Sequence, residues 1–523
     1  MFRLDGLKVA VHGGWGEIGG NQIVLEAPEG SLLLDFGRSF SRWNRHFTEF
    51  LTPRSGLGLR DLLALGLLPP YRGLYREGEA DTLFPGELER SFLQPHLEGE
   101  KVRALLLSHA HLDHTGAVAY LRENLPVVST ASTAAILKAM QDTAQVGLEA
   151  EAAYLNPRRP NGQGLLEAHP KSPYQRRPYH LLGGELKEIA SLSPSKSKPL
   201  EGHPWQAATE PLSLGPFRVW AHPVDHSVPG AVAFVLETPA GRVVYTGDLR
   251  FHGQQGRQTK ALVETLEKHE TTLLIVEGTR LGRSGQTYSE AQVQAALCEA
   301  IRQHPSGPIA VDFAPRNLER LRACLEAGRE AGRTLVITPK DAYLLYSLAE
   351  AEPAWKGTLE QCRVLQEPRS RSTQWEEHLW AQAPVKAVEM TEIARQPEAF
   401  VLAFGFFEVN RLLDLRLLSG FKAQGLYIFS NSYWADDEQI LDLQVLLNWL
   451  NRLNFRLLPA GLQALPKDPS TVDNPYHTSG HAPQEDLLEL AQRLKPRYLL
   501  PVHTEQPQLW ENWLPGTKVL LEK

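Results

Sequence analysis

The chain has 523 residues, a formal net charge of −7 at pH 7, and 42% hydrophobic and 22% charged residues. This length exceeds what one ordinary core supports, so we expect two or more domains of a soluble globular protein. The acidic balance excludes a whole-chain basic footprint for nucleic acid. Any such contact would depend on local patches or on metal ions.

The small number of cysteines and the length of the apolar segments indicate the cellular compartment in which we expect the protein. Cys298, Cys324 and Cys362 show neither a metal-type spacing nor a disulfide framework. The N-terminus lacks the apolar core of a signal peptide. No stretch reaches the roughly 18 uncharged apolar residues of a membrane helix. We therefore expect a cytoplasmic protein with no membrane partner.

The first half of the chain predicts short apolar strands separated by glycine-rich turns. Strands are expected at residues 7–12, 22–26, 31–35 and 102–107. A glycine-rich loop occupies 13–21, a helix-like segment 117–124, and an inserted excursion 39–100. Residues 156–204 are rich in Pro, Ser, Lys and Arg and predict a long loop or a partly disordered insertion. We favour a solvated loop over an RNA guide for its basic residues Arg158, Arg159, Lys171, Arg176 and Arg177.

The second half begins with further strands and then changes pattern. Strands are expected at 217–221, 231–237, 242–246 and 272–276. Beyond residue 289, helices alternate with apolar strands, which indicates a parallel α/β domain. Its helices are expected at 292–303, 317–331 and 438–453, and its strands at 308–313, 334–338, 400–403 and 426–429. A helix at 485–494 and a strand at 498–502 close the chain.

The strongest chemical signal is a cluster of four donors on the loop after the strand at 102–107. The cluster comprises His109, His111, Asp113 and His114. A catalytic zinc takes three protein ligands and keeps one position open. Alternate residues of an extended backbone point the same way, so the first two histidines suit one ion and the last two donors suit a second.

Two ions need ligands from elsewhere, and three candidates lie at strand ends. They are His226, Asp248, which could bridge both ions, and His503. Loops built on a rigid sheet commonly carry functional groups at such places. For His222 and His252 we favour a structural role. The unit as a whole predicts a metal centre.

At this point the sequence resembles a known family. The pattern from His109 to His114, the later His226 and the strand end Tyr245-Thr246-Gly247-Asp248 are similar to the metallo-β-lactamase superfamily. Glu277 in Val-Glu-Gly-Thr-Arg, Ser479-Gly480-His481 and Pro501-Val502-His503 resemble the three motifs of its β-CASP nuclease branch. The glycine-rich loop at 13–21 resembles the opening of ribonuclease J.

The resemblance implies an α/β fold with a split first domain. An αββα metallo-β-lactamase sandwich would be formed by residues 1–288 and 464–523, with a parallel α/β β-CASP domain inserted at 289–463. The chain ends soon after His503, without the further domain that ribonuclease J uses in dimer formation. The segments 39–100 and 156–204 also depart from the family pattern. A homo-oligomer is therefore not implied.

The resemblance also implies a role for each site residue. His109, His111 and His226 would hold one zinc; Asp113, His114 and His503 would hold the other; Asp248 would bridge them, and Asp35 would support the loop from behind. The catalytic set would be His481, which protonates the leaving oxygen, with Glu277 and Asp113. Ser479, Gly480 and His477 would bind the substrate, although a solvated loop is an equal alternative for His477. For the Ser430-Asn431-Ser432 segment we favour a plain turn over a phosphate site.

The function implied is a ribonuclease that hydrolyses phosphodiester bonds of single-stranded RNA with a hydroxide activated by two metals. Two Zn²⁺ are expected, with Mn²⁺ as the alternative. In the family, a histidine at the position of His503 is typical of RNA-processing members, whereas Artemis-like DNA nucleases usually have valine. Three alternatives stay open: a β-CASP nuclease acting on DNA, a small-molecule metallo-hydrolase, and a scaffold that has lost its metals. The RNA target and the mode of cleavage, endo- or exonucleolytic, also stay open.

Overall fold

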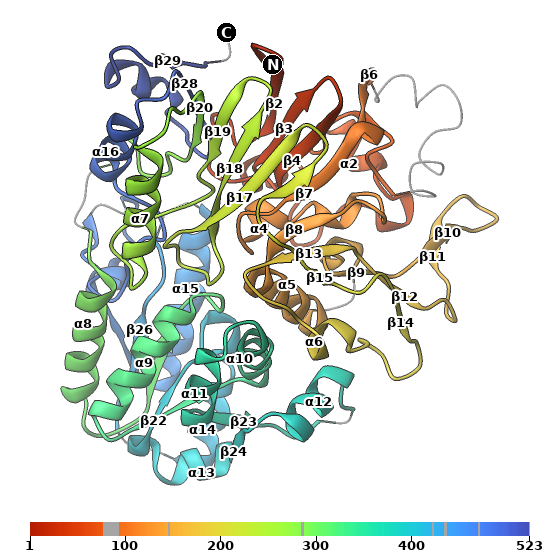
Figure 1. Cartoon of the computed structure of the whole chain (residues 1–523). Coiled ribbons are helices and arrows are strands. Elements are labelled where there is room, and N and C mark those ends of the chain that lie inside the picture. Colours follow the sequence, from red (N-terminus) through yellow and green to blue (C-terminus); the bar gives the residue numbers. More distant parts are fainter. Residues whose placement is uncertain are drawn as a thin grey trace.

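A computed structural model of the chain describes residues 1–76, 94–144, 147–283, 287–369, 371–420, 423–433, 437–468 and 471–521. Three large sheets organise it (Figure 1). Two of them stack face to face, and the third lies below them in the view of Figure 1, beside helices α8 to α14. Among the described residues, every helix is too short or too polar to cross a bilayer.

The first sheet has eight strands, antiparallel from β1 to β4 and parallel from β4 to β15. In spatial order they are β1 (Phe2–Leu4), β2 (Leu7–Gly13), β3 (Gln22–Ala27), β4 (Gly30–Phe36), β7 (Val102–Leu106), β8 (Val127–Thr130), β13 (Tyr179–Leu182) and β15 (Gln206–Ala207). Every residue of β4 is buried, because both faces of the sheet are covered at this strand.

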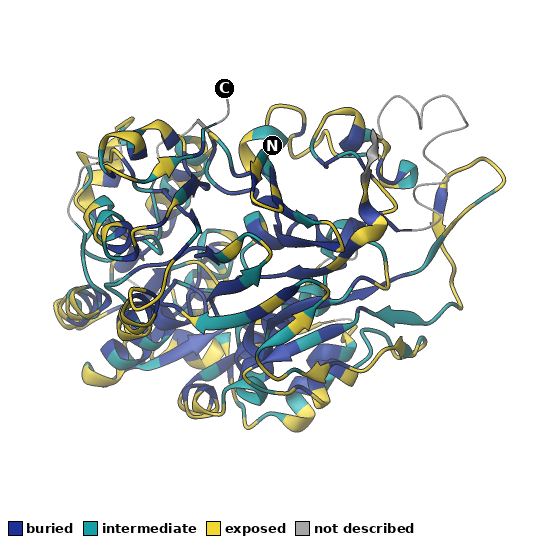
Figure 2. Cartoon of the chain, turned by 45° about the horizontal axis from the view of Figure 1, so that its top comes forward, coloured by how far each residue is buried: buried dark blue, intermediate teal, exposed yellow. Residues whose placement is uncertain are grey.

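The second sheet has seven strands and takes its last two from the end of the chain. In spatial order they are β16 (Leu212–Leu214), β17 (Phe217–Pro223), β18 (Val232–Thr238), β19 (Gly241–Tyr245), β20 (Leu273–Val276), β28 (Tyr498–Pro501) and β29 (Lys518–Val519). Apolar side chains of the two sheets, such as Leu34 and Phe234, share one core. Figure 2 shows buried residues concentrated along these stacked strands.

Helices close the outer faces of the two sheets. Over the first sheet lie α2 (Arg60–Ala64) and α5 (Ala131–Thr143), whose apolar residues join the core that also contains Val24 and Leu33. Over the second lie α7 (Gly256–Leu266) and α16 (Gln484–Leu494). The predicted αββα sandwich is therefore confirmed.

The third sheet is wholly parallel, as predicted for the α/β region. Its spatial order is β24 (Lys386–Glu389), β23 (Arg363–Gln366), β22 (Thr334–Ile337), β25 (Phe400–Leu402), β21 (Ile309–Asp312), β26 (Gly425–Phe429) and β27 (Phe455–Leu458). Its helices are α8 (Glu290–Arg302), α9 (Leu318–Glu330), α10 (Pro339–Ala351), α11 (Ala354–Gln361), α12 (Gln374–Gln382), α13 (Met390–Arg395), α14 (Arg411–Ser419) and α15 (Asp437–Leu453). Along the chain, all its strands come after β20 and before β28. Because β20 and β28 are paired parallel neighbours in the second sheet, the domain is an insertion. The domain limits at 288 and 463 stay a prediction.

Local sequence explains where the inserted helices begin. Ser289 and Thr338 each form a capping box at the start of α8 and α10, and Pro339 occupies the first turn of α10. The Asn317 side chain caps α9 by accepting a hydrogen bond from the Arg320 backbone N–H.

The expectation of a loop or disorder at 156–204 was wrong. The segment contains β10 (Arg158–Pro160), β11 (Leu166–Ala168), β12 (Tyr174–Arg176), β13, α6 (Glu188–Ser191) and β14 (Leu200–Gly202), and β13 joins the first sheet. Arg177 is fully buried and donates to the backbone carbonyls of Ala119 and Leu121. A charged side chain of this segment therefore stabilises the fold through buried hydrogen bonds, which composition alone does not reveal. Part of the predicted excursion at 39–100 lies outside the described residues.

The helix predicted at 117–124 is also wrong in extent. The chain forms a short helix earlier, α4 (Leu112–Thr115), and only one 3₁₀ turn at Val118–Tyr120. Gly116 lies between them, and its Cβ position is filled by the Leu112 carbonyl at 2.6 Å. The Ala117 backbone N–H donates to the carbonyl of Phe36, the last residue of β4, at 3.0 Å instead of to a preceding helical turn.

Candidate metal centre

The predicted ligands meet where strand ends of the two stacked sheets come together. His109 and His111 follow β7, and α4 carries Asp113 and His114. The other members lie just beyond strand ends of the second sheet: His226 after β17, Asp248 after β19 and His503 after β28. All seven predicted ligand residues lie in one cluster.

Three groups of donors form within this cluster and all share Asp248; the seven predicted ligands make up two of them, and the third joins Asp248 and His503 to Glu277 and His481. In the first, His111 Nδ1 lies 3.2 Å from His109 Nε2 and 3.1 Å from His226 Nε2. In the second, His503 Nε2 lies 3.1 Å from Asp113 Oδ2, and His114 Nε2 lies 3.1 Å from Asp248 Oδ2. Within each group the donor atoms lie inside 4.8 Å of one another. This is the arrangement predicted for two ions and one bridging carboxylate.

In three of the histidines, the ring nitrogen that faces away from the cluster contacts another group. The other ring nitrogen is thereby directed toward the cluster. His114 Nδ1 donates to Asp35 Oδ2 at 2.7 Å, and His226 Nδ1 donates to the Gly480 carbonyl at 2.6 Å. His503 Nδ1 lies 2.8 Å from Thr279 Oγ1. Such outer partners fix the orientation of metal-binding imidazoles. The predicted support by Asp35 corresponds to this contact.

Several buried oxygen and nitrogen atoms of the cluster have no hydrogen-bond partner. These atoms show whether the residues present would suit a metal ion. Both carboxylate oxygens of Asp248 and Nε2 of His114 are in this state, although His114 Nε2 and Asp248 Oδ2 lie 3.1 Å apart. Buried polar atoms are nearly always paired, so an orphaned set that faces one point indicates a missing partner. Two oxygens and one ring nitrogen can all accept a cation. The donor set fits a metal.

The electrostatics of the cluster agree with this. Burial lowers the pKa of His109 well below its ordinary value, and His114 and His226 lower it further, so its imidazole is neutral. Burial opposes charge on His114 too, but Asp248 and Asp35 outweigh it and raise its pKa well above normal. The first group thus offers free lone pairs, while the carboxylates around the second favour positive charge.

Two glycines allow the close packing of the metal loop. A Cβ on Gly37 would lie 1.7 Å from the Asp113 carbonyl oxygen. A Cβ on Gly19, whose φ is +76°, would lie 2.7 Å from the Asp113 side chain. Gly19 of the glycine-rich loop and Gly37 after β4 therefore both lie directly against α4, and a side chain at either position would displace Asp113.

His481 and Glu277 form a pair at the open side of the cluster. His481 Nδ1 lies 2.9 Å from Glu277 Oε2, and Glu277 is fully buried and also accepts from the Leu249 backbone N–H. Burial lowers the pKa of His481, but Glu277 and Asp248 outweigh it and raise the pKa to about 9. His481 is half-buried, so its ring can meet a ligand.

The structure locates the predicted substrate-binding residues beside this pair. Gly480 approaches so closely that a Cβ would lie 2.6 Å from Ser227 Oγ. Ser479 Oγ accepts from the His481 backbone N–H. The His477 ring contacts Ser432 Oγ at 3.1 Å and lies 3.3 Å from the Ser430 carbonyl, so it is packed in a loop rather than freely solvated.

Sequence reasoning missed three residues that complete the site. Thr279 contacts both His503 and Glu277, and its only signal is its place two residues after Glu277. Arg250 is fully buried, contacts Asp225 beside His226, and donates to the Ser479 carbonyl at 3.2 Å. Arg316 of the inserted domain donates to the carbonyl of Ala110 at 3.1 Å. No motif indicated either arginine.

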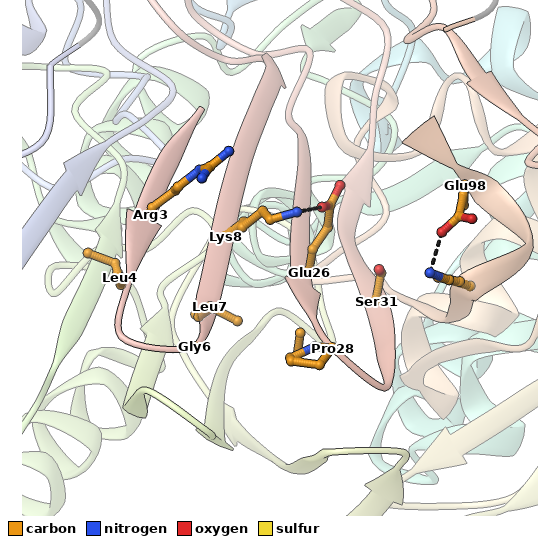
Figure 3. A pocket seen from close by; sticks show the side chains of 11 residues that line it. Arg3, Leu4, Gly6, Leu7, Lys8, Glu26, Pro28, Ser31 and Glu98 are labelled. Atoms are coloured by element: carbon orange, nitrogen blue, oxygen red, sulfur yellow. Dashed lines mark ion pairs between the residues drawn. The ribbon is translucent and has the colours of Figure 1, made fainter. Parts of the chain in front are cut away.

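A surface hollow over the outer face of β1–β4 is unrelated to the cluster. Lys8 pairs there with Glu26, and Lys101 with Glu98 (Figure 3). None of the metal-centre residues lines this hollow. Its charges largely satisfy one another.

Comparisons with known proteins agree with the geometry. A model of the metallo-beta-lactamase superfamily matches residues 81–297, and a model of the Zn-dependent metallo-hydrolase RNA specificity domain matches residues 472–510. Together with the donor set, they support a metal cofactor.

Relatives extend the similarity beyond these two regions. Ribonuclease J of Helicobacter pylori is 22% identical over 518 residues, 95% of this chain and 56% of the relative. Ribonuclease J of Pyrococcus abyssi is 24% identical over 510 residues, 96% of this chain and 91% of the relative. The chain thus spans about half the length of some curated relatives. A solved structure of a protein of unknown function from Enterococcus faecalis has a TM-score of 0.66 at 21% identity, covering 99% of this chain and 98% of that one, and so shows the same fold. Residues 81–297 therefore match the metallo-β-lactamase superfamily, and nearly the full length of the chain is similar to ribonuclease J.

Proposed function

We propose that the chain is a metal-dependent ribonuclease that hydrolyses phosphodiester bonds of single-stranded RNA. One observation carries the proposal: two donor groups share Asp248, and the His481–Glu277 pair lies at their open side. Hydrolysis of a phosphodiester needs neutralised phosphate charge, a water nucleophile and a proton for the departing oxygen. The cluster and the pair together can serve all three needs.

In this proposal the metal ligands divide as the two groups divide. His109, His111 and His226 would hold one Zn²⁺, Asp113, His114 and His503 would hold the second, and Asp248, which belongs to both groups, could serve both. When bound, the two ions activate a water and neutralise the scissile phosphate. Mn²⁺ is the alternative metal, since nitrogen and oxygen donors suit both.

His481 supplies the proton in this proposal. Its Nδ1 faces Glu277, whose carboxylate holds the imidazole in one orientation and favours its protonated form. The opposite nitrogen, Nε2, is then the atom that gives a proton to the leaving oxygen. Ser479 and Gly480 lie beside it and line the place of a phosphate oxygen.

RNA is favoured over DNA and over a small substrate. The RNA specificity model covers 472–510, which includes His477, the Ser479–His481 segment and His503. The relatives matched over nearly the whole chain carry the name ribonuclease J. A small-molecule hydrolase needs no inserted α/β domain beside the cluster. Cytoplasmic location and oligomeric state stay predictions.

The test combines metal analysis with cleavage of end-labelled RNA and DNA of matched sequence. We expect two metals per chain and RNA cleavage that a chelator abolishes. His481→Ala should keep its metal and cleave slowly, whereas the exposed control His203→Ala should behave as wild type. Cleavage of DNA at an equal or higher rate would overturn the substrate assignment. Unchanged cleavage by His481→Ala would overturn the proton-donor role.

A further inference from the structure

Arg316 is the feature beside the cluster that the ligand set does not explain. It lies on the loop between β21 and α9, so it belongs to the inserted domain, yet it reaches the metal loop. Its Nη1 donates to the carbonyl of Ala110, the residue between His109 and His111. Arg316 therefore lies where the two domains meet at the metal centre.

The loop that carries Arg316 is held firmly at both ends. Asp312, at the end of β21, is buried, and its carbonyl accepts from the Ser430 backbone N–H at 2.7 Å. At the other end, Asn317 caps α9. Ala314 and Pro315, between them, are exposed, as is Leu112 on the facing metal loop. Arg316 thus lies at a solvent-open rim with a fixed backbone.

Most donors of the Arg316 guanidinium remain available. The group carries five N–H donors, and the bond to Ala110 uses one of them. Among the residues that the structure describes, no carboxylate lies within 4.0 Å of the guanidinium. The nearby Asp113 turns its Oδ2 to His503 instead. The residue as a whole is partly exposed, while burial of its guanidinium lowers the pKa of the group.

The charge balance of the site specifies the kind of ligand. Asp35, Asp113, Asp248 and Glu277 bring four negative charges, which two divalent cations would balance. Arg316 then adds a positive charge with which no carboxylate of the described residues forms an ion pair. A planar guanidinium binds a phosphate with two parallel hydrogen bonds, which an ammonium cannot do.

We propose that Arg316 is a phosphate-binding residue that holds a non-bridging oxygen of the RNA backbone beside the His/Asp cluster. The RNA backbone then passes between the metal loop and the loop after β21. The inserted domain thereby takes part in substrate binding. This inference rests on the proposed function for its substrate class, but the phosphate contact itself can be measured without cleavage.

The first test measures RNA binding by fluorescence anisotropy, with labelled single-stranded RNA and zinc-loaded protein carrying His481→Ala. Arg316→Met should weaken binding about 10- to 100-fold. It should also lower the slope of log affinity against log salt by about 0.7, the value for one lost phosphate contact on a single strand. Arg316→Lys keeps the charge and should keep the slope while binding more weakly. The control Arg329→Met changes an exposed arginine of α9, the helix that follows the loop of Arg316, and should change neither.

The second test separates binding from a merely structural role. If Arg316 served only to hold the Ala110 carbonyl, Arg316→Met would lose metal or unfold at a lower temperature, with an unchanged salt slope. That result overturns the inference, as does an unchanged slope in a variant with full metal content.

Calorimetry with inorganic phosphate as the probe decides the case if RNA is not the substrate. Phosphate should bind the zinc-loaded protein and bind Arg316→Met at least about tenfold more weakly. Wild-type protein that binds phosphate through Arg316 but neither binds nor cuts RNA would refute the proposed function alone. RNA cleavage with phosphate and RNA binding unaffected by Arg316→Met would refute this inference alone.

Discussion

Arg250 is the centre of a buried charge network that joins the two domains at the metal site. It pairs with Asp225 at 3.2 Å in the sandwich, and with Glu290 at 3.0 Å and Glu319 at 2.6 Å in the inserted domain. Arg320 also pairs with Glu290. Two positive and three negative charges are therefore enclosed together, and the guanidinium of Arg250 touches every carboxylate.

Arg250→Met leaves these carboxylates under-compensated. Glu290 keeps Arg320, and Asp225 keeps the Gly253 backbone N–H, but Glu319 loses its ion pair. Breaking a buried pair on one side costs about 3–5 kcal/mol. In a protein of this size we expect the midpoint of thermal unfolding to fall by roughly 3–5 °C.

Two further variants test this reasoning. Adding Glu319→Gln to Arg250→Met removes the carboxylate left alone, so the double variant should recover at least about 1 kcal/mol. The control Arg218→Met breaks an exposed pair with Glu237 and should cost less than about 1 kcal/mol. Differential scanning fluorimetry and urea titration measure all three. A loss as small for Arg250→Met as for Arg218→Met, or no recovery in the double variant, would refute the reasoning.

The remaining predictions concern single positions. Asp248→Ala should release both metals, because both donor groups share this carboxylate, and the metal-to-protein ratio by atomic absorption measures it. Gly37→Ala should destabilise the chain and reduce metal content, since the added Cβ meets the Asp113 carbonyl at 1.7 Å; thermal unfolding beside the metal ratio would show this, and wild-type values would contradict it. Burial raises the pKa of Asp312 to about 7, although Tyr427 lowers it by a hydrogen bond and Glu408 raises it further. Between about pH 4 and pH 7 the folded chain therefore keeps a proton on Asp312 that the unfolded chain has lost. The stability that this proton contributes is full below about pH 4, is lost as the pH rises through 7, and totals at most about 4 kcal/mol. Asp312→Asn should remove this loss between pH 5 and 8, and an unchanged pH dependence of unfolding would contradict it.

Sequence patterns predicted the parts of the site that depend on local order. The four donors from His109 to His114 lie within six residues, and the remaining ligands follow strands of simple apolar composition. A strand end fixes where the next side chain goes, so β17, β19 and β28 bring His226, Asp248 and His503 to one place. The parallel α/β domain was likewise visible in its alternating pattern.

What sequence patterns missed depends on contacts between distant segments. Arg177 stands in a stretch that is basic and rich in proline, yet it is buried among backbone carbonyls nearly sixty residues away in the chain. Arg250 has partners in α8 and α9, and Arg316 contacts Ala110 from another domain. An isolated arginine looks the same in sequence whether it is solvated or enclosed. Only the tertiary neighbours decide its role.

The arginines also indicate how a widely used metal fold acquires a particular substrate. Fold alone does not determine function, and the His/Asp cluster by itself suits many hydrolyses. Arg250 fixes the inserted domain against the loops of His226 and Ser479, and Arg316 extends that domain to the metal loop. Residues of both domains therefore surround the cluster. Changes at the domain contact should therefore alter RNA affinity and cleavage while the metal content stays constant, because every proposed ligand belongs to the sandwich.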